Sequence, residues 1–248
     1  MTPDPAPMRR PDALAAAPAS PALPAVPDEP VVALGSVPYR DAWALQRALH
    51  AERAGGRRGD TLLLLEHPPV VTLGRTGGAE FLLGDGPLVH PTLGPIEVVP
   101  TDRGGKVTYH GPGQLVGYGI VALAERKLFP ATYVHAMEGV LVKVLADLGI
   151  EACAIPGRVG VWTAGRKIAS IGVRITEGVS LHGFALNVEN DLTPFALMHP
   201  CGLLDVQMTS LRLEGVAASL AEVRARIARR WLEVFPHRER ASVQEARP

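Results

Sequence analysis

Apolar residues recur every three or four positions in three stretches of the chain, and this spacing places them on one face of a helix. The first stretch covers residues 41–53 and is followed by two glycines, which favour the end of a helix. The second covers residues 132–148 and stops at Gly149. The third covers about 219–234, where Ser219 and Glu222 form a capping box. We therefore predict three helices that each bury one face.

Shorter apolar runs lie between the predicted helices and are typical of β-strands. They cover residues 61–65, 70–73, 96–99, 115–121, 168–175 and 180–188. The strands outnumber the helices and do not alternate with them regularly. The pattern therefore predicts an α/β fold of the α+β kind, a mixed sheet with flanking helices, and not a repeated βαβ unit.

Composition separates the two ends of the chain from its centre. Nine of the first 30 residues are prolines mixed with alanines, so residues 1–30 are predicted to form a disordered tail. Residues 237–248 are polar and are predicted to fray. The remaining residues, 31–236, are expected to form a single domain, because a chain of 248 residues with 47% hydrophobic residues can bury one sizeable core.

Charge and cysteine usage exclude several classes of protein. Lysine plus arginine and aspartate plus glutamate are balanced at 25 each, so the net charge does not indicate a nucleic-acid or membrane-surface partner. No apolar run approaches the roughly 20 residues that a membrane span requires. Two cysteines are too few for a disulfide framework. We expect a cytoplasmic protein that binds neither nucleic acid nor membrane and has free thiols.

Two glycine-punctuated segments carry the candidate chemistry, residues 165–172 with Lys167 and residues 199–202 with Cys201. A thiol is an effective nucleophile only as a thiolate, and a nearby ammonium favours that form. If the segments meet, they form a Cys/Lys dyad. The alternatives are a solvent-facing lysine at the start of a strand and a cysteine that acts as a small buried hydrophobe. Cys153 fits the second alternative better than Cys201, whose proline and glycine neighbours favour an exposed loop.

The densest motif covers residues 102–118, in which two groups of glycines bracket a short strand with Tyr109 and His110. Glycine lets the backbone pass close to a ligand, and its amides can face an oxyanion. The motif is either a binding wall or two tight turns around an edge strand, and the residues alone do not decide between them. Its spacing matches neither the Walker pattern nor the dinucleotide fingerprint.

The histidines do not predict a metal site. His67, His110, His182 and His199 have no close-paired spacing, and Cys201 has no second cysteine at metal-ligand spacing. His182 either lines a site or satisfies a hydrogen bond in the core, and the adjacent glycine favours the site.

Five segments, in this order, resemble the octanoyltransferase family of lipoate biosynthesis. They are residues 65–70, 103–114, 165–172, 182–188 and 200–202. The resemblance implies a fold like that of the biotin/lipoate protein ligases. It also implies a two-step reaction, in which an octanoyl group passes from acyl carrier protein to a cysteine as a thioester and then to a lysine of a lipoyl domain.

The resemblance implies no cofactor, because the acyl group arrives on the phosphopantetheine arm of acyl carrier protein. The implied acceptors are the lipoyl domains of 2-oxoacid dehydrogenase complexes and the glycine cleavage H protein. By residue match, Cys201 is the nucleophile and Lys167 lowers the pKa of its thiol. The implied substrate-binding residues are Arg103, Gly104, Gly105, Lys106, Val107, Thr108, Tyr109, His110, Ser170, Ile171, Gly172, Gly183, Phe184 and Ala185. Lys106 departs from the family pattern, in which glutamine or another polar residue is common.

Three other functions remain open. An ATP-dependent lipoate or biotin ligase with the same fold would activate its acid as an adenylate and would need no nucleophilic cysteine. A non-catalytic carrier-binding protein would dock acyl carrier protein without turnover. A cysteine hydrolase would use His182 or His110 as its base and would release free octanoate.

Overall fold

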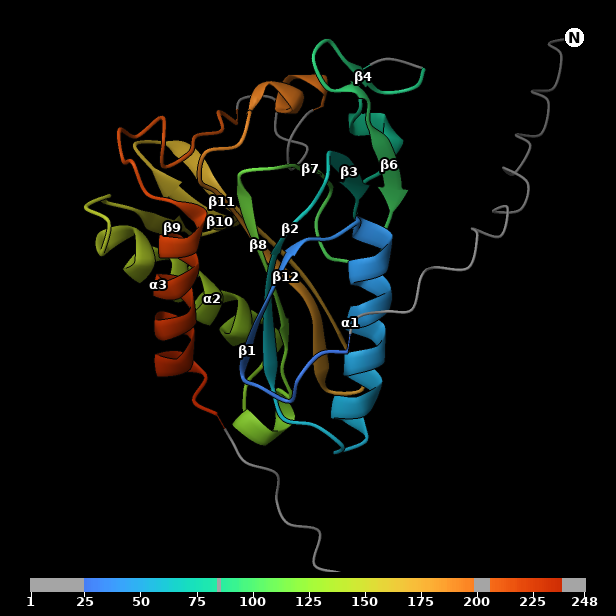
Figure 1. Ribbon diagram of the computed structural model, residues 1–248, viewed down its shortest axis with the longest axis vertical. Helices are drawn as coiled ribbons and strands as arrows, with labels where there is room; N and C mark the ends of the chain where they lie inside the picture. The colour runs from blue at the N-terminus through green and yellow to red at the C-terminus, as the bar shows by residue number, and fades with distance from the viewer. Residues whose placement is uncertain (1–24, 84–85, 199–205, 238–248) are drawn as a thin grey trace, which may run out of the picture.

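The computed structural model describes residues 25–83, 86–198 and 206–237, which form a central mixed sheet with helices on both faces (Figure 1). The elements are, in chain order, β1 (Val31–Ser36), α1 (Tyr39–Ala54), β2 (Thr61–Glu66), β3 (Val70–Leu73), the short helix η1 (Ala79–Phe81), β4 (Val89–His90), β5 (Gly94–Pro95), β6 (Glu97–Pro100), β7 (Val107–His110), β8 (Gln114–Ile120), η2 (Ala124–Arg126), α2 (Pro130–Ala146), β9 (Cys153–Ile155), β10 (Arg158–Thr163), β11 (Arg166–Thr176), β12 (Val179–Asn187), η3 (Thr193–Leu197) and α3 (Leu220–Val234).

The central sheet has seven strands in the described part of the chain, in the order β1-β2-β8-β12-β11-β10-β9. Strands β1 and β2 are parallel, and every other neighbouring pair is antiparallel. A second sheet with the strand order β6-β3-β7 lies beyond one end of α1 (Figure 1). The prediction of a mixed sheet with flanking helices is confirmed.

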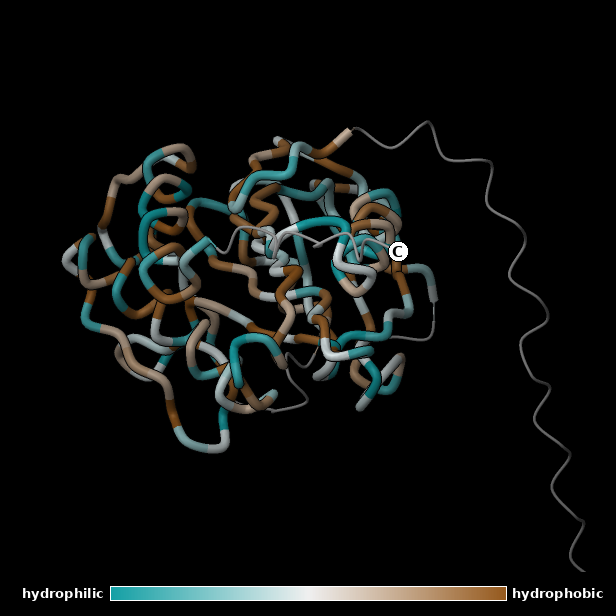
Figure 2. The backbone as a smooth tube through the Cα atoms, turned by 90° about the horizontal axis from the view of Figure 1, so that it is seen from below, coloured by the Kyte–Doolittle hydropathy of each residue, from teal (hydrophilic) through white to brown (hydrophobic). Residues whose placement is uncertain are grey.

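Each face of the central sheet has its own apolar core. Helix α1 covers one face through Leu45 and Leu49, which pack with Leu63 and Leu65 of β2. Helices α2 and α3 cover the other face, where Trp231 joins the second core. Figure 2 shows hydrophobic and hydrophilic stretches alternating along the helices, as expected when one face of a helix is buried.

The predicted helices and long strands are present, with small shifts at their ends. The Ser219 side chain accepts a hydrogen bond of 3.2 Å from the Glu222 backbone N–H, so the predicted helix cap is confirmed. Three strands of the central sheet, β1, β9 and β10, were not predicted. None of the helices in the described ranges is long and apolar enough to cross a membrane.

The two cysteines have different outcomes. Cys153 was predicted to be buried, and this prediction is wrong because the residue is exposed. It lies on β9, the edge strand of the central sheet, and within the described ranges no strand pairs with the outer side of β9. Cys201 lies outside the described residues, as do residues 1–24 of the predicted tail and 238–248 of the C-terminal end. Pro27 and Asp28, near the end of the predicted tail, hydrogen bond to Arg58 and Gly59.

Candidate active site

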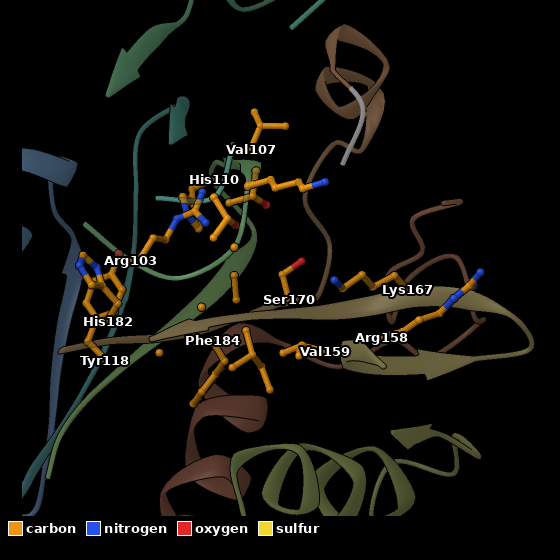
Figure 3. A pocket seen from close by; sticks show the side chains of 18 of the residues that line it. Arg103, Val107, His110, Tyr118, Arg158, Val159, Lys167, Ser170, His182 and Phe184 are labelled. Atoms are coloured by element: carbon orange, nitrogen blue, oxygen red, sulfur yellow. The ribbon is translucent and has the colours of Figure 1, made fainter. Parts of the chain in front are cut away.

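A cavity of about 270 Å³ lies where the loop before β7 approaches strands β11 and β12 (Figure 3). Its surface is mostly apolar. Thirteen of the sequence-predicted site residues line it: Arg103, Gly105, Lys106, Val107, Thr108, His110, Lys167, Ser170, Ile171, Gly172, Gly183, Phe184 and Ala185. Segments that are up to 82 residues apart in the sequence, from Arg103 to Ala185, therefore meet at one site.

Two predicted residues do not line the cavity. Tyr109 is buried in the small core beside β7, where its ring packs edge-to-face on Phe195 at 5.7 Å between centroids. Gly104 stays in the wall, where its backbone N–H donates a 2.9 Å hydrogen bond to the Val173 carbonyl and so joins the loop to β11. The cavity also has lining residues that the sequence did not indicate: Tyr39, Thr76, Tyr118, Gly157, Arg158, Val159 and Trp162.

Lys167 lies at one end of the cavity and is only 2% exposed (Figure 3). Its ammonium lies 5.4 Å from the centre of the Trp162 ring, which is a cation–π contact. Gly160 provides the space for this side chain, because a Cβ there would lie 2.6 Å from Cε of Lys167. The alternative of a solvent-facing lysine is therefore wrong.

The segment that begins at residue 206 pairs with the strand that carries Lys167. The Lys167 backbone N–H donates to the Gln207 carbonyl at 2.8 Å, and the Thr209 N–H donates to the Lys167 carbonyl at 2.9 Å. The Asn187 side-chain amide donates to the Thr209 carbonyl at 2.9 Å. Gln207 follows Cys201 by six positions in the sequence.

The floor of the cavity is made of small residues on two paired strands. Ser170 of β11 lies opposite Ala185 of β12, and Gly172 lies opposite Gly183. A Cβ at Gly172 would lie 2.7 Å from the Gly104 carbonyl oxygen, so glycine is required for the loop to approach this closely. Small side chains on adjoining rungs leave the open space above the sheet.

Arg103 fixes the loop that forms the opposite wall. Its Nη2 donates to the Thr72 carbonyl at 2.6 Å and to the Thr72 hydroxyl at 2.8 Å. Its Nη1 donates to the Gly104 carbonyl at 3.0 Å. A buried guanidinium with these partners holds the glycine turn against β3, so the arginine shapes the cavity as well as lining it.

The far end of the cavity contains His182, whose backbone has a left-handed φ of 59°. In a regular strand its side chain would point away from its neighbours Leu181 and Gly183. The left-handed conformation instead places the ring near Tyr39 and Trp43 of α1. The His182 backbone N–H donates to Gln46 at 2.8 Å, which fixes the kink. Such strain in a non-glycine residue is often found at a functional site.

Asp102 holds the His182 ring through a 2.7 Å contact between Nε2 and Oδ1. A carboxylate only accepts, so Nε2 carries a proton. Burial lowers the pKa of His182, although the hydrogen bond from its ring to Asp102 acts in the opposite direction. The same hydrogen bond lowers the pKa of Asp102, with smaller help from Arg174. His182 thus both lines the cavity and satisfies hydrogen bonds in the core.

His67 and Tyr118 form a second hydrogen-bonded pair behind this end. Nδ1 of His67 lies 2.6 Å from the Val37 carbonyl, which can only accept, and Nε2 lies 2.7 Å from the Tyr118 hydroxyl. Burial lowers the pKa of His67 to about 4, so the neutral ring is present at neutral pH. Nδ1 therefore donates and Nε2 accepts from Tyr118. In the described ranges, no group of three or more histidine, cysteine or acidic residues is arranged to hold a metal ion.

The chain is similar in sequence to a family of known proteins. The model of the lipoyl protein ligase A/B catalytic domain family matches residues 38–231. An octanoyltransferase of Geobacter sulfurreducens is 45% identical over 86% of this chain and 89% of its own length. An octanoyltransferase of Mycobacterium tuberculosis is 49% identical over 79% of this chain and 82% of its own length.

Solved structures of similar fold are lipoate ligases. A lipoate-protein ligase A bound with ATP has a TM-score of 0.62 and 18% identity, over 83% of this chain and 84% of its own. A bipartite lipoate protein ligase of Thermoplasma acidophilum has a TM-score of 0.60 and 19% identity, over 83% of this chain and 82% of its own. The family match and the curated relatives show that the chain belongs to the lipoyl protein ligase A/B catalytic domain family, as an acyltransferase of its octanoyltransferase group.

Proposed function

We propose that this enzyme transfers an octanoyl group from acyl carrier protein to a lysine of a lipoyl domain, through a thioester on Cys201. The observation that carries the proposal is the buried Lys167 ammonium at one end of a mostly apolar cavity. The backbone of this lysine pairs with the segment that follows Cys201 in the sequence. No cofactor takes part, because the donor thioester is already activated.

In the first step the Cys201 thiolate attacks the carbonyl of the octanoyl thioester. The carbon–sulfur bond to the phosphopantetheine arm breaks, and the released thiolate takes a proton from the Lys167 ammonium, which leaves Lys167 neutral. Lys167 supports this step by lowering the pKa of the Cys201 thiol, since the ammonium stabilises the thiolate. Backbone amides of the glycine loops are the candidate donors to the oxyanion, and loss of one such donor typically costs about 3 kcal/mol.

In the second step the uncharged amine of the acceptor lysine attacks the thioester carbonyl. An amide forms, the bond to Cys201 sulfur breaks, and the amine proton passes to the neutral form of Lys167, which restores the thiolate–ammonium pair. Amide formation from a thioester is downhill, so ATP is not required. The acceptors are the lipoyl domains of 2-oxoacid dehydrogenase complexes and the glycine cleavage H protein.

The cavity binds the hydrocarbon chain of the acyl group. Each methylene that leaves water contributes about 0.8 kcal/mol. Val107, Ile171 and Phe184 supply apolar lining, and the small floor residues leave the space. The acyl carbonyl of the donor and the amine of the acceptor lysine both approach at the Lys167 end.

The covalent step is tested by intact mass. We expect the wild-type chain to gain one octanoyl group from octanoyl-acyl carrier protein, and Cys201→Ala to gain none. Transfer to a lipoyl domain by Cys201→Ala at the wild-type rate would exclude the thioester. Transfer from free octanoate that depends on ATP would favour the ligase reaction instead.

The role of Lys167 is tested separately by the rate of Cys201 alkylation with iodoacetamide across pH. A Cys153→Ser background removes the exposed second thiol. We expect Lys167→Ala to move the alkylation midpoint to higher pH. Lys143, exposed on α2, offers a matched lysine-to-alanine control that should leave the midpoint in place. An unchanged midpoint in Lys167→Ala would contradict the assigned role.

A further inference from the structure

The cavity has one open and one closed end. At the open end, the Val159 side chain is 51% exposed, and Arg158 is also exposed. At the other end, Tyr118 and His182 are 4% and 1% exposed. Figure 3 shows Lys167 and Arg158 at one side of the view, and Tyr118 and His182 at the opposite side. A chain that enters beside Lys167 therefore runs towards a buried wall.

The strand register shows what forms this wall. Gly172 of β11 lies opposite Gly183 of β12, and Gly183 lies opposite Tyr118 of β8. Residues directly opposite on neighbouring strands point to the same face of a sheet. The Tyr118 ring therefore stands beside two glycines on one rung, so the floor changes there from residues without side chains to a large aromatic ring.

The wall is held in place by hydrogen bonds on its far side. The Tyr118 hydroxyl bonds to His67, and His67 bonds to the Val37 carbonyl. The adjoining His182 is fixed by Asp102 through its ring and by Gln46 through its backbone. Displacing either ring would leave buried polar groups without partners, which proteins rarely tolerate.

We infer that Tyr118, supported by His182, limits the length of the acyl chain that the enzyme accepts, because the methyl end of the chain stops against the Tyr118 ring. This inference rests on the proposed acyl transfer. A longer chain would have to displace a fixed ring or leave methylenes outside the cavity. One misplaced methylene in a hydrophobic pocket typically changes the rate about tenfold or more.

The test measures the rate of acyl-enzyme formation from octanoyl-, decanoyl- and dodecanoyl-acyl carrier protein, by intact mass of the full chain. We expect wild type to discriminate against decanoyl by about tenfold or more. Tyr118→Leu should reduce this discrimination to a few-fold, because leucine removes most of the ring. Tyr118→Phe is the matched control. It loses the bond to His67 but keeps the ring, so its chain-length preference should stay closer to that of wild type than the preference of Tyr118→Leu.

A second variant tests the path of the chain from the opposite direction. Ser170 projects into the space between the two ends (Figure 3). Ser170→Leu should shorten that space and shift the preference from octanoyl to hexanoyl by about tenfold. This variant keeps the inference testable if Tyr118→Leu does not fold, as judged by thermal unfolding.

The outcomes separate the inference from the proposed function. If wild type forms no acyl-enzyme with any chain length, the proposed function fails. If wild type forms the octanoyl-enzyme but folded Tyr118→Leu keeps the wild-type discrimination, Tyr118 is not the limit. An unchanged chain-length preference in Ser170→Leu would contradict the inferred path of the acyl chain past Ser170. Equal rates for octanoyl and dodecanoyl in wild type would show that the cavity sets no limit on chain length.

Discussion

Lys167 owes its buried position to a neighbour that has no side chain. Gly160 lies on β10 at an irregularity in the pairing with β9 and has a φ of +123°. Its backbone N–H donates a hydrogen bond of 2.9 Å to the buried Glu138 carboxylate, which anchors the irregular backbone. Glycine at this position therefore serves two purposes: it adopts a left-handed φ, and it leaves room for the Lys167 methylenes.

Replacing Gly160 with alanine should therefore impair acyl transfer. The added Cβ would lie 2.5 Å from the Ala169 carbonyl oxygen and 2.6 Å from Cε of Lys167. We expect a loss of about 1–3 kcal/mol of stability from backbone strain and at least a tenfold loss of octanoyl transfer from a displaced ammonium. Urea unfolding and transfer assays at matched folded fractions measure the two effects.

Gly165→Ala is the control for this change. Gly165 also has a left-handed φ, of +77°, but a Cβ there meets no atom within 4 Å. The Gly165→Ala variant should lose stability through backbone strain. It should keep the wild-type pH dependence of Cys201 alkylation. Equal transfer rates in Gly160→Ala and Gly165→Ala would show that contact with Lys167 is not the reason for the glycine.

The sequence predicted site residues where the residue type is unusual for its surroundings. A lysine beside an apolar strand and glycines around a histidine are unusual in this way. The sequence did not identify Tyr118 or Trp162 as site residues, because aromatic residues are common in apolar strands. Only the strand register shows which face of the sheet these two residues occupy. Asn187 was likewise hidden, since its partner in the 206–209 segment lies 22 residues away.

Strands and helices were predictable where the apolar pattern is long and continuous, as in β2, β8 and α2. Strand β9 has only three residues at the sheet edge, and Gly160 interrupts β10. Strand β1 directly follows the proline-rich tail and is mostly half-buried or exposed. Edge strands bury one side at most, so their composition differs little from that of loops.

The end of β12 holds the 206–209 segment in place through Asn187. The side-chain oxygen of Asn187 accepts from Gln114 at 2.9 Å and from Asn190 at 3.2 Å, while its amide donates to Thr209. Asn187→Ala should lose this clamp, because alanine can make none of the three bonds. We expect the Thr209 amide, which bonds to Lys167, to exchange at least tenfold faster with deuterium.

Ser180→Ala is the matched control on the same strand. The Ser180 hydroxyl donates to the Gly119 carbonyl at 2.7 Å and accepts from the Val121 N–H at 3.0 Å, so its loss also removes buried hydrogen bonds. It lies at the opposite end of β12 from Asn187. We expect Ser180→Ala to lose about as much global stability as Asn187→Ala. Unlike Asn187→Ala, it should not selectively speed the deuterium exchange of the Thr209 amide. If both variants speed Thr209 exchange equally, Asn187 contributes only to global stability.

Three buried histidines, His67, His110 and His182, lie between the central sheet, α1 and the small sheet. The rings of His67 and His110 lie 5.6 Å apart, and Tyr39 stacks on His110 at 5.9 Å. Burial lowers the pKa of all three site histidines, His182 included, and for His110 the lowering is large. Folding therefore takes place most easily when none of these rings carries a charge.

Stability should consequently fall on mild acidification. In the unfolded chain these histidines titrate near pH 6.5, whereas the folded pKa of His67 is about 4. Between these values the unfolded state binds more protons, so the free energy of unfolding decreases as pH falls, by about 3 kcal/mol for His67 alone. The lowered pKa of Asp102 affects stability only below about pH 4.

Urea unfolding between pH 7.5 and 4.5 measures how the free energy of unfolding changes with pH. His67→Gln, which does not titrate, should flatten this dependence, and a wild-type stability that is constant over this range would contradict neutral burial.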